Sequence, residues 1–426
     1  MSTLLRLATA GSVDDGKSTL VGRLLHDTKS VLADQLDAVE RVSRDRGLTS
    51  ADLALLTDGL RAEREQGITI DVAYRYFATA HRSFVLADCP GHVQYTRNTV
   101  TGSSTADAVV LLVDARKGVL EQTRRHLAVA ALMRVPHVVV VVNKIDLVHH
   151  SEADFRSVAA DVRSLAVELG IPDAHAVPVS ALVGDNVVDR STNTPWYEGP
   201  SLLELLEALA PDTDPAHESF RMPVQVVVRP QGAARSPEHV EYRGYAGQLA
   251  SGSIRVGDEV VVLPSGTRTT VAGIDLGERS LDVAVAPQSV TIRLTDDVDV
   301  SRGDLLCAAS DPVALRQEVQ ALACWLGDEP LHPGARLLVK HGSRTVQAMV
   351  RSVDGRLDLD AMRLAPADRL QLNDIGRVTV RFASPLPVED YSTSRRGGAF
   401  LLVDPDDGRT LAAVMAGALA PGEHRG

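Results

Sequence analysis

The segment that most constrains the fold of this chain is Gly11–Thr19, with the sequence Gly-Ser-Val-Asp-Asp-Gly-Lys-Ser-Thr. It matches the phosphate-binding pattern G-x-x-x-x-G-K-[ST] at every fixed position. An apolar run at Leu4–Ala10 predicts a strand before it, and Leu20–His26 predicts a helix after it. Glycines let the loop curl so that its N–H groups point at phosphate oxygens, and the helix adds its positive dipole end. A chance match in a glycine-rich turn is the alternative, and the strand–loop–helix context disfavours it.

Two side chains of this loop are predicted to carry its chemistry. Lys17 is placed to neutralise charge on the β- and γ-phosphates, and the Ser18 hydroxyl is placed to bind Mg²⁺. Asp14 either binds a monovalent cation or shapes the loop, and both interpretations stay open. By itself the loop predicts only that a nucleoside triphosphate binds.

Composition limits the partners and the compartment. At roughly 100–200 residues per domain, 426 residues predict two to four domains. A formal net charge of −12 argues against a generally basic nucleic-acid-binding protein. No apolar run reaches the roughly 20 residues of a membrane span, and the N-terminus resembles no signal peptide, so we expect a cytoplasmic protein. The 3 cysteines form no C-x-x-C pair, which predicts neither a zinc site nor a disulfide framework.

Hydrophobic patterning predicts three domains. Residues 1–212 alternate strand-like and helix-like segments, and continuous apolar runs such as Val138–Val142 are typical of strands buried on both faces of a sheet. We therefore expect an α/β domain with a mostly parallel, doubly wound sheet. After a linker at Pro211–Pro215, short strand-like runs predict antiparallel β-barrel domains at 218–312 and 313–426. Met222–Val228 and Val256–Leu263 are each expected to form one strand.

Gly67–Asp71, with the sequence Gly-Ile-Thr-Ile-Asp, ends a long charged segment and fits a loop that senses the γ-phosphate. Thr69 is predicted to give its side-chain oxygen to Mg²⁺ and its N–H to the γ-phosphate, so that the loop is ordered only when that phosphate is present. Taken alone, this segment is better explained as a glycine turn that enters a β-branched strand.

Asp88–His92, with the sequence Asp-Cys-Pro-Gly-His, ends an apolar strand. Asp88 is predicted to reach Mg²⁺ through water, the Gly91 N–H to bind the γ-phosphate, and His92 to orient the attacking water. The alternative for His92 is a surface histidine in a turn. We favour the functional interpretation because the four preceding residues also fit.

Asn143–Asp146, with the sequence Asn-Lys-Ile-Asp, follows the valine-rich strand directly. The Asp146 carboxylate can accept both the N1 and N2 protons of guanine, whereas adenine would leave it unpaired at a cost of about 1–3 kcal/mol or more. Capping of a helix by Asn or Asp is the alternative. Ser180–Leu182 follows the last predicted strand, and its backbone is expected to contact guanine O6.

These five segments, in this order and at strand ends, predict a Mg²⁺-dependent GTPase. The predicted catalytic residues are Lys17, Thr69, Gly91 and His92, and the predicted Mg²⁺ ligands are Ser18, Thr69 and, through water, Asp88. The predicted GTP contacts are Gly11, Ser12, Val13, Asp14, Asp15, Gly16, Lys17, Ser18, Thr19, Asp88, Cys89, Pro90, Gly91, His92, Asn143, Lys144, Ile145, Asp146, Ser180, Ala181 and Leu182.

With its Gly-Ile-Thr-Ile loop, its Asp-x-Pro-Gly-His segment and two β domains, the chain resembles the translation-factor GTPases, which include elongation factor Tu. Nearly the full chain resembles one branch, the large GTPase subunit of heterodimeric bacterial ATP sulfurylase (sulfate adenylyltransferase subunit 1). The segments that carry this likeness are Gly11–Leu20, Gly22–Thr28, Asp58–Phe77, Gly91–Asn98, Asp114–Gly118, Gln122–His126, Pro195–Pro200, Arg243–Gly247 and Ser301–Asp304.

The resemblance implies a specific activity and partner. GTP hydrolysis is expected to be coupled to the formation of adenosine 5′-phosphosulfate and pyrophosphate from ATP and sulfate, on a smaller catalytic subunit in a heterodimer or a higher assembly. No second G-x-x-x-x-G-K-[ST] segment is present, so the adenylylsulfate kinase domain of some relatives is not expected. Alternatives are a translation factor that acts with tRNA or the ribosome, and a scaffold that binds GTP without hydrolysing it.

Cys89 is a departure, because the family usually has Thr at this position. Asp88, Pro90, Gly91 and His92 are intact, so we expect hydrolysis to survive. Oxidation or alkylation of Cys89 is a hypothesis for inhibition that rests on its position alone.

Overall fold

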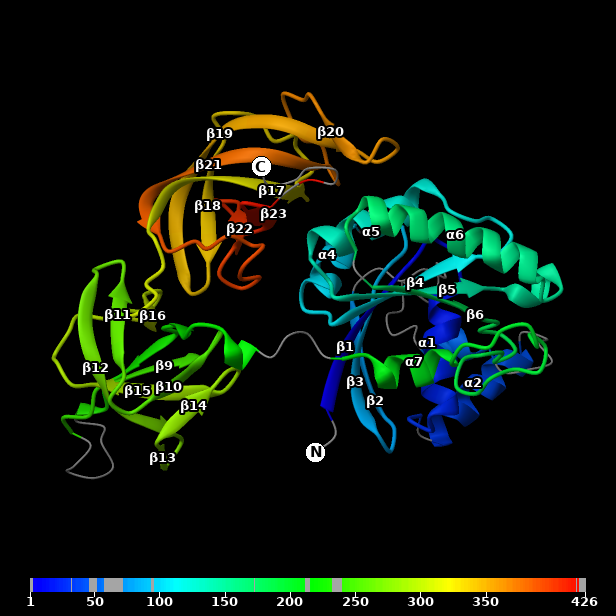
Figure 1. The fold of residues 1–426 in the computed structure, drawn as a ribbon, viewed down its shortest axis with the longest axis horizontal. Helices are drawn as coiled ribbons and strands as arrows, with labels where there is room; N and C mark the ends of the chain where they lie inside the picture. Colours follow the sequence, from blue (N-terminus) through cyan, green and yellow to red (C-terminus); the bar gives the residue numbers. More distant parts are fainter. Residues whose placement is uncertain are drawn as a thin grey trace.

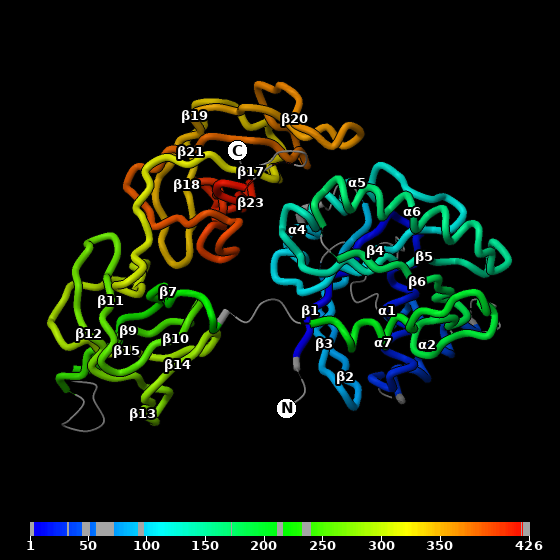
Figure 2. Tube along the Cα trace, in the orientation of Figure 1, coloured from blue at the N-terminus to red at the C-terminus, as the bar shows by residue number. Residues whose placement is uncertain are grey.

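The computed structural model describes residues 3–31, 33–45, 52–56, 72–92, 96–171, 173–210, 215–231, 240–418 and 420. The predicted loop Gly67–Asp71, with Thr69, lies outside the described residues, as does the predicted linker except Pro215. Figure 1 shows an α/β domain and two β domains, and the tube of Figure 2 follows the chain through them in that order. Within these ranges, no helix is both long and apolar enough to cross a membrane.

The first domain is built on a six-stranded sheet with the order β2-β3-β1-β4-β5-β6. The strands are β1 (Thr3–Ala10), β2 (Ala73–Ala78), β3 (Arg82–Asp88), β4 (Ala108–Asp114), β5 (His137–Asn143) and β6 (Ala174–Pro178). All neighbours pair in parallel except β2, which is antiparallel to β3. The predicted mostly parallel sheet is confirmed.

Helices cover both faces of this sheet (Figure 1). Side chains of α1 (Lys17–Asp27) and α7 (Leu202–Ala208) pack with Leu5, Leu7 and alternate residues of β3, β4 and β5. The intervening strand residues point to the other face, where they pack with α4 (Thr96–Ser104), α5 (Glu121–Leu132) and α6 (Glu152–Glu168). The remaining helical elements of the domain are α2 (Ala33–Asp45), η1 (Leu53–Leu56) and η3 (Ile145–Val148). All seven residues of β4 are buried, because apolar side chains are needed on both of its faces.

The second domain is antiparallel throughout. One sheet has the order β7-β16-β11-β12-β15-β9-β8, with β13 paired to β12, and β10 pairs separately with β14. A short helical turn, η4 (Pro215–His217), precedes the strands. The strands are β7 (Arg221–Pro223), β8 (Val226–Val228), β9 (Gly244–Gln248), β10 (Ser253–Arg255), β11 (Glu259–Leu263), β12 (Thr267–Leu276), β13 (Arg279–Leu281), β14 (Val283–Val285), β15 (Ser289–Leu294) and β16 (Leu305–Ala308).

Two expected strands of this domain are wrong in detail. Met222–Val228 is two strands, because Val224 N donates to Asp304 O (2.8 Å) and Gln225 N donates to Ala246 O (2.9 Å), so the chain changes pairing partner between them. The strand expected at Val256–Leu263 begins only at Glu259. Gly257 before it has φ 93°, a left-handed conformation that belongs to a turn.

The third domain is a closed antiparallel barrel. Its strands are β17 (Arg316–Trp325), β18 (Arg336–His341), β19 (Arg344–Asp358), β20 (Arg363–Ala365), β21 (Ile375–Leu386), β22 (Ala399–Val403) and β23 (Thr410–Ala416). Their order is β18-β22-β23-β17-β21-β19-β20, and an additional β18–β19 pairing closes the ring. The exact domain boundaries stay a prediction.

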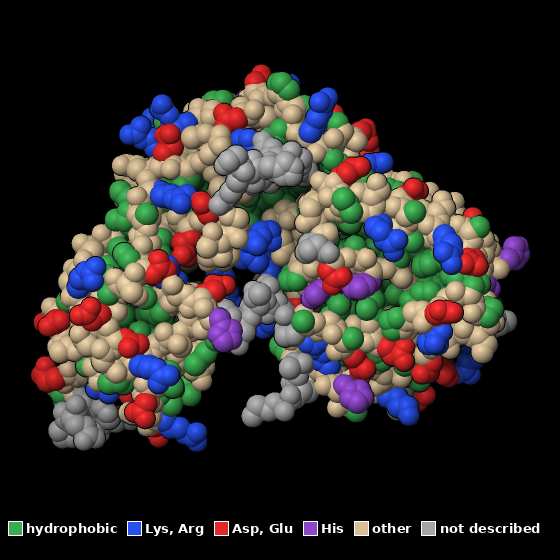
Figure 3. Space-filling model, viewed as in Figure 1, with side chains coloured by type: hydrophobic (Ala, Val, Ile, Leu, Met, Phe, Trp, Pro, Cys, Tyr) green, Lys and Arg blue, Asp and Glu red, His purple; other side chains and the backbone are tan. Residues whose placement is uncertain are grey.

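The third domain packs directly on the first. One apolar cluster contains Leu132 and Met133 at the end of α5 together with Cys324 and Met415 of the third domain. Tyr391 Oη donates to Met133 O across this contact (3.0 Å). On the face drawn in Figure 3, the surface is hollowed between the first and second domains, and the third domain lies above both.

Candidate nucleotide-binding site

The loop after β1 has a backbone that excludes side chains at two positions. Gly11 has φ 143°, and a Cβ atom there would lie 2.8 Å from Leu112 O. Gly16 has φ 94°, and a Cβ atom would lie 2.5 Å from Asn143 Nδ2. Asp14 also has a positive φ, of 67°. The fixed glycines of the predicted phosphate loop are therefore required by geometry.

Lys17 is the first residue of α1, and its ammonium group bends back over the loop. Nζ donates to Gly11 O (2.9 Å) and Ser12 O (2.8 Å). Burial lowers the pKa of Lys17, while the nearby carboxylates of Asp15 and Asp88 oppose that change. Its two hydrogen-bond partners are neutral carbonyls, so this buried ammonium is suited to exchange them for an anionic ligand.

The loop after β3 meets the phosphate loop. A Cβ atom on Gly91 would lie 2.2 Å from Lys17 Nζ and 2.6 Å from Gly11 O, so only glycine allows this approach. Asp88 is buried, and its carboxylate accepts a hydrogen bond from Thr9 Oγ1 (3.0 Å), which in turn accepts from Cys89 N (3.0 Å). Thr9 therefore fixes the end of β3 beside the start of the phosphate loop.

The Cys89 thiol is buried and packs away from solvent, against α4. Its Sγ lies 3.6 Å from Ala87 O, and a Cβ atom on Gly102 would approach it to 2.4 Å. Burial raises the pKa of this thiol, an effect that Asp88 increases and Lys17 opposes. The hypothesis that Cys89 is a reactive inhibitory site is therefore wrong for this conformation, because a buried neutral thiol is a poor nucleophile.

Two buried polar atoms in the phosphate loop lack a hydrogen-bond partner among the described residues. They are Ser12 Oγ and Asp15 Oδ1. The other Asp15 oxygen accepts from Ser12 N (2.7 Å). Burial raises the pKa of Asp15, although the Ser12 N–H bond and Lys17 oppose it. Since buried polar atoms are normally paired, this part of the loop fits a polar ligand such as a phosphate with its cation.

Asn143 at the end of β5 joins three loops. Its Nδ2 donates to Asp15 O (2.7 Å), and its Oδ1 accepts from Ala181 N (3.0 Å). Asn143 therefore holds the phosphate loop and the Ser180–Leu182 loop in fixed positions on either side of it. Asn143 therefore lies beside the phosphate loop, as the sequence predicts. Its role in binding GTP stays a proposal.

Lys144 and Asp146 follow Asn143 in a turn. Lys144 has φ 62° and donates to Asp14 O, and its Nζ lies 3.2 Å from Asp114 Oδ2. Asp146 lies in η3 and is half-buried. Ile145 between them is buried, and its N–H donates to Val179 O (3.2 Å), which fixes the turn against the end of β6.

The Ser180–Leu182 loop is held mainly through its backbone. Ala181 is buried, and its carbonyl accepts from Arg23 Nε (3.2 Å), whereas the Leu182 side chain is exposed. His92 is exposed and lies in the loop that follows β3, and β3 is the neighbour of β1 in the sheet. The structure thus brings together four of the five predicted segments, while Thr69 lies outside the described residues.

The sequence did not predict Asp114 as a residue of the site, but its carboxylate lies beside Lys144. Burial works to raise the pKa of its carboxyl group, but hydrogen bonds from Arg116 and Lys144 outweigh burial and lower that pKa well below its usual range. Arg116 Nη2 lies 2.7 Å from Asp114 Oδ2. The available signal was its place at the end of β4, between β1 and β5, because ligand loops of such sheets follow the carboxyl ends of strands.

Two family models match the chain. The elongation factor Tu GTP binding domain matches residues 2–212, and the GTP-eEF1A C-terminal domain-like family matches residues 318–416. Sulfate adenylyltransferase subunit 1 of Cellvibrio japonicus is 47% identical over 97% of this chain and 86% of its own. The chain belongs to the sulfate adenylyltransferase subunit 1 family. It is a GTP-binding protein.

Two further relatives also support membership of this family. Subunit 1 of Bacteroides fragilis is 47% identical over 97% of this chain and 85% of its own. The bifunctional enzyme CysN/CysC of Mycobacterium tuberculosis is 51% identical over 97% of this chain, which spans 67% of that relative. A solved structure of sup35 complexed with GDP covers 98% of this chain and 95% of its own at 24% identity, with a TM-score of 0.43.

Proposed function

We propose that this subunit hydrolyses GTP to GDP and phosphate, and that hydrolysis is coupled to sulfate activation on a partner subunit. The partner reaction converts ATP and sulfate to adenosine 5′-phosphosulfate and pyrophosphate. Membership of the sulfate adenylyltransferase subunit 1 family supports this pathway over action on tRNA or the ribosome. The single observation that carries the GTPase part is the convergence of Lys17, Gly91 and Asn143 on one phosphate loop.

The residues present fit a triphosphate. The Lys17 ammonium would exchange its two carbonyl partners for β- and γ-phosphate oxygens. Gly91 N–H and the loop N–H groups of residues 11–19 would donate to the same phosphates. His92 would orient the water that attacks the γ-phosphorus, so that a new O–P bond forms as the bond to the GDP oxygen breaks.

Ser18, Thr69 and, through water, Asp88 would hold Mg²⁺, which would supply positive charge to offset that of the phosphates. Among the described residues, no group of three or more His, Cys, Asp or Glu side chains is placed to hold a metal. A monovalent cation near Asp14 remains part of the proposal, beside the alternative that Asp14 shapes the loop.

Guanine would be bound by the Asp146 carboxylate and by backbone groups of Ser180–Leu182. The Asn143 amide is engaged on both sides by protein, with Asp15 O and Ala181 N, so it would position these loops. Lys144, tied to Asp14 O and Asp114, would hold the base-binding turn against the phosphate loop.

The test is the Lys17→Ala variant, reconstituted with the partner subunit and assayed with and without GTP. We expect it to lose GTP hydrolysis and the GTP-stimulated yield of adenosine 5′-phosphosulfate together, because Lys17 lies at the centre of the phosphate loop. Lys340→Ala, an exposed lysine on β18, is the matched control and should keep both activities. Stimulation that survives in Lys17→Ala would refute the coupling.

A further inference from the structure

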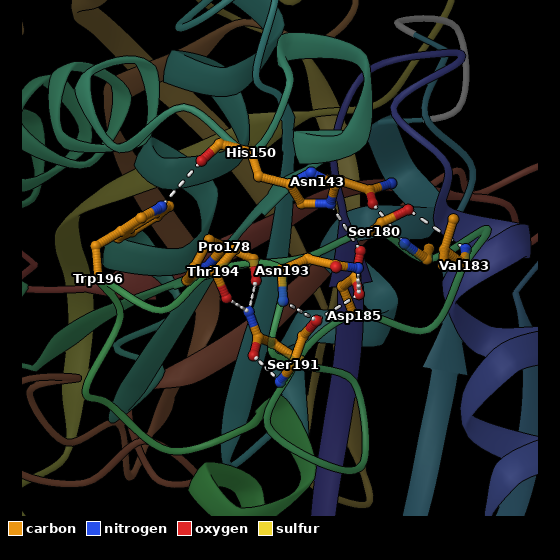
Figure 4. Close-up of polar contacts among 12 residues, drawn as sticks. Asn143, His150, Pro178, Ser180, Val183, Asp185, Ser191, Asn193, Thr194 and Trp196 are labelled. Atoms are coloured by element: carbon orange, nitrogen blue, oxygen red, sulfur yellow. Dashed lines mark hydrogen bonds and ion pairs between the residues drawn. The ribbon is translucent and has the colours of Figure 1, made fainter.

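A buried carboxylate ties together the two loops that face the proposed guanine position. Asp185 follows Ser180–Leu182 by three residues and is 6% exposed. Figure 4 shows it between His150, Ser191 and Asn193. Asp185 Oδ2 accepts from His150 Nε2 (2.9 Å), and Oδ1 accepts from Ser191 Oγ (2.6 Å) and Asn193 Nδ2 (2.9 Å). This side chain is part of no motif that the GTPase proposal uses.

His150 ends the turn that begins at Asn143. Its N–H donates to Ile145 O (2.8 Å), and it has a positive φ of 56°, so the whole turn is closed at this residue. Its carbonyl accepts from Trp196 Nε1 (2.9 Å), as Figure 4 also shows. Trp196 packs on Phe155 of α6 with ring centroids 5.3 Å apart. The aromatic segment Pro195–Pro200 thus anchors His150 from the side opposite Asp185.

The backbone of Asp185 also closes the Ser180–Asp185 loop. Ser180 N donates to Asp185 O (3.2 Å), and Gly184 N donates to Ser180 O (2.7 Å). Ala181 N, on the same loop, donates to the Asn143 side chain (3.0 Å). The carboxylate of Asp185 therefore holds the end of the Asn143–His150 turn, while its backbone fixes the start of the Ser180–Asp185 loop.

The hydrogen-bond network beside Asp185 has a buried residue, Asn186, at its centre. Asn186 is 1% exposed, donates to Pro178 O (2.8 Å) and Thr194 Oγ1 (2.9 Å), and accepts from Ser191 N (2.8 Å). Burial works to raise the pKa of Asp185, but hydrogen bonds from Ser191, His150 and Asn193 outweigh it and lower that pKa, so the group is charged near neutral pH. Charged hydrogen bonds of this kind are stronger and more directional than neutral ones.

We propose that Asp185 is a positioning residue for guanine recognition: with His150 it sets the distance between the Asn143–Asp146 turn and the Ser180–Leu182 loop, so that both face the base together. Asp185 itself does not touch the base. The inference rests on the proposed GTPase function and adds a determinant of base affinity to it. Since the phosphate loop contacts Asn143 and not Asp185, loss of Asp185 should weaken binding of the base and leave the hydrolytic groups in place.

The experiment compares Asp185→Ala with a control at the opposite end of β5 and β6. There, the partly exposed Asp173 carboxylate pairs with His137 Nδ1 at 2.6 Å and His175 Nε2 at 2.6 Å. The probe is a fluorescent GDP analogue titrated into the full chain, together with kcat for GTP hydrolysis. We expect Asp185→Ala to raise the Kd by about tenfold or more with kcat at saturating GTP within about twofold of wild type, and Asp173→Ala to leave both unchanged.

Two further variants keep the inference testable if Asp185→Ala fails to fold. Asp185→Asn retains an oxygen for Ser191 and Asn193 and should raise the Kd less than Asp185→Ala does. His150→Ala removes the partly exposed imidazole that pairs with Asp185, and this variant should also raise the Kd. Unchanged Kd values in these variants, or a loss of kcat and thermal stability with no selective rise in Kd, would overturn the inference. Failure of the wild-type chain to bind the GDP analogue would instead contradict the proposed function.

Discussion

Asp146 is the residue on which the choice of base depends in the proposed site. A carboxylate accepts from both N1–H and N2–H of guanine, whereas an amide offers one acceptor and one donor. Xanthine has an oxygen in place of the N2 amine, which matches the amide. We expect Asp146→Asn to lower the affinity for GTP by about tenfold to a hundredfold and to favour XTP, as measured by competitive hydrolysis of the two nucleotides.

The control for this variant is Asp161→Asn, an exposed position on α6 that should keep the wild-type preference for GTP. An Asp146→Asn protein that still prefers GTP over XTP to the wild-type extent would show that the base contacts another residue.

His126 on α5 is a buried neutral histidine beneath the phosphate loop. The Gln122 amide nitrogen lies 3.2 Å from its Nε2, and since an amide nitrogen only donates, that ring nitrogen carries a lone pair. Burial, and then the charge of Lys17, lower the pKa of His126 to about 3. In the unfolded chain a histidine titrates near pH 6.5. Between these values the unfolded state binds a proton that the folded state does not, so stability falls as the pH falls.

We therefore expect acid to destabilise the first domain through His126, with no effect of this residue above about pH 7. Lowering the pH from 7.5 to 5.5 should cost the wild type about 1.4 kcal/mol of unfolding free energy more than it costs His126→Gln. Urea unfolding at both pH values measures the difference. His81→Gln, at an exposed turn, should keep the wild-type response. Equal acid sensitivity of His126→Gln and wild type would mean that the ring is protonated in the folded protein.

At the scale of elements, patterning located the strands of the first domain well. The Val138–Val142 run predicts β5, which extends one residue further at each end, because continuous apolar sequence is needed for a strand buried on both faces. Strand prediction was weaker in the second domain. Short strands such as β10 and β16 carry too few residues for a period to show, and the change of partner at Val224–Gln225 depends on Asp304 and Ala246, far away in the sequence.

In the candidate site too, local features could be predicted from the sequence and long-range contacts could not. The phosphate loop and the Asn143–Asp146 turn were predictable because each is a local backbone shape with a fixed residue requirement, such as glycine at position 16. The ties of Lys144 to Asp114, and of His150 to Asp185, join residues 30 or more apart in the chain. No local pattern encodes such a pair, so only the folded arrangement of β4, β5 and β6 reveals it.

The packing of α4 on β3 gives a prediction at this scale. A Cβ atom on Gly102 would lie 2.4 Å from Cys89 Sγ, so Gly102→Ala should push α4 away from the strand despite the better helix propensity of alanine. We expect it to destabilise the domain by about 1–3 kcal/mol, the usual cost of overpacking. Removing the sulfur in the double variant Gly102→Ala/Cys89→Ala should recover part of this loss, as measured by thermal unfolding.

Gly22→Ala provides the control for this coupling. A Cβ atom on Gly22 of α1 would lie 2.1 Å from the backbone oxygen of Leu53, so this variant should also be destabilised. Cys89→Ala should not rescue it, because the obstructing atom is elsewhere. If the Gly102→Ala and Cys89→Ala effects simply add, the helix and the thiol are not in tight contact.

At the scale of the whole molecule, the segment Val388–Ser392 joins the three domains. Arg221 of the second domain is 8% exposed at its side chain and pairs with Glu389 (3.2 Å) and Asp311 (2.9 Å). Two residues further, Tyr391 is buried against the first domain and its carbonyl accepts from Arg134 Nη1 (2.8 Å). One short segment therefore contacts the end of α5 on one side and the second domain on the other.

Tyr391 fills the contact between the first and third domains, and its removal tests how firmly they are joined. Tyr391→Ala deletes a ring that is 3% exposed together with the Oη–Met133 hydrogen bond, at a cost of about 3–5 kcal/mol to the contact. We expect a larger radius of gyration in solution scattering and thermal unfolding in two separated steps. GDP affinity should stay at the wild-type value, because the hydroxyl of Tyr391 bonds to Met133, which is none of the predicted GTP contacts. Tyr391→Phe keeps the ring, loses only the hydrogen bond, and should remain compact. A Tyr391→Ala protein with unchanged scattering would show that the ion pairs of Arg221 and the rest of the apolar cluster hold the three domains together without it.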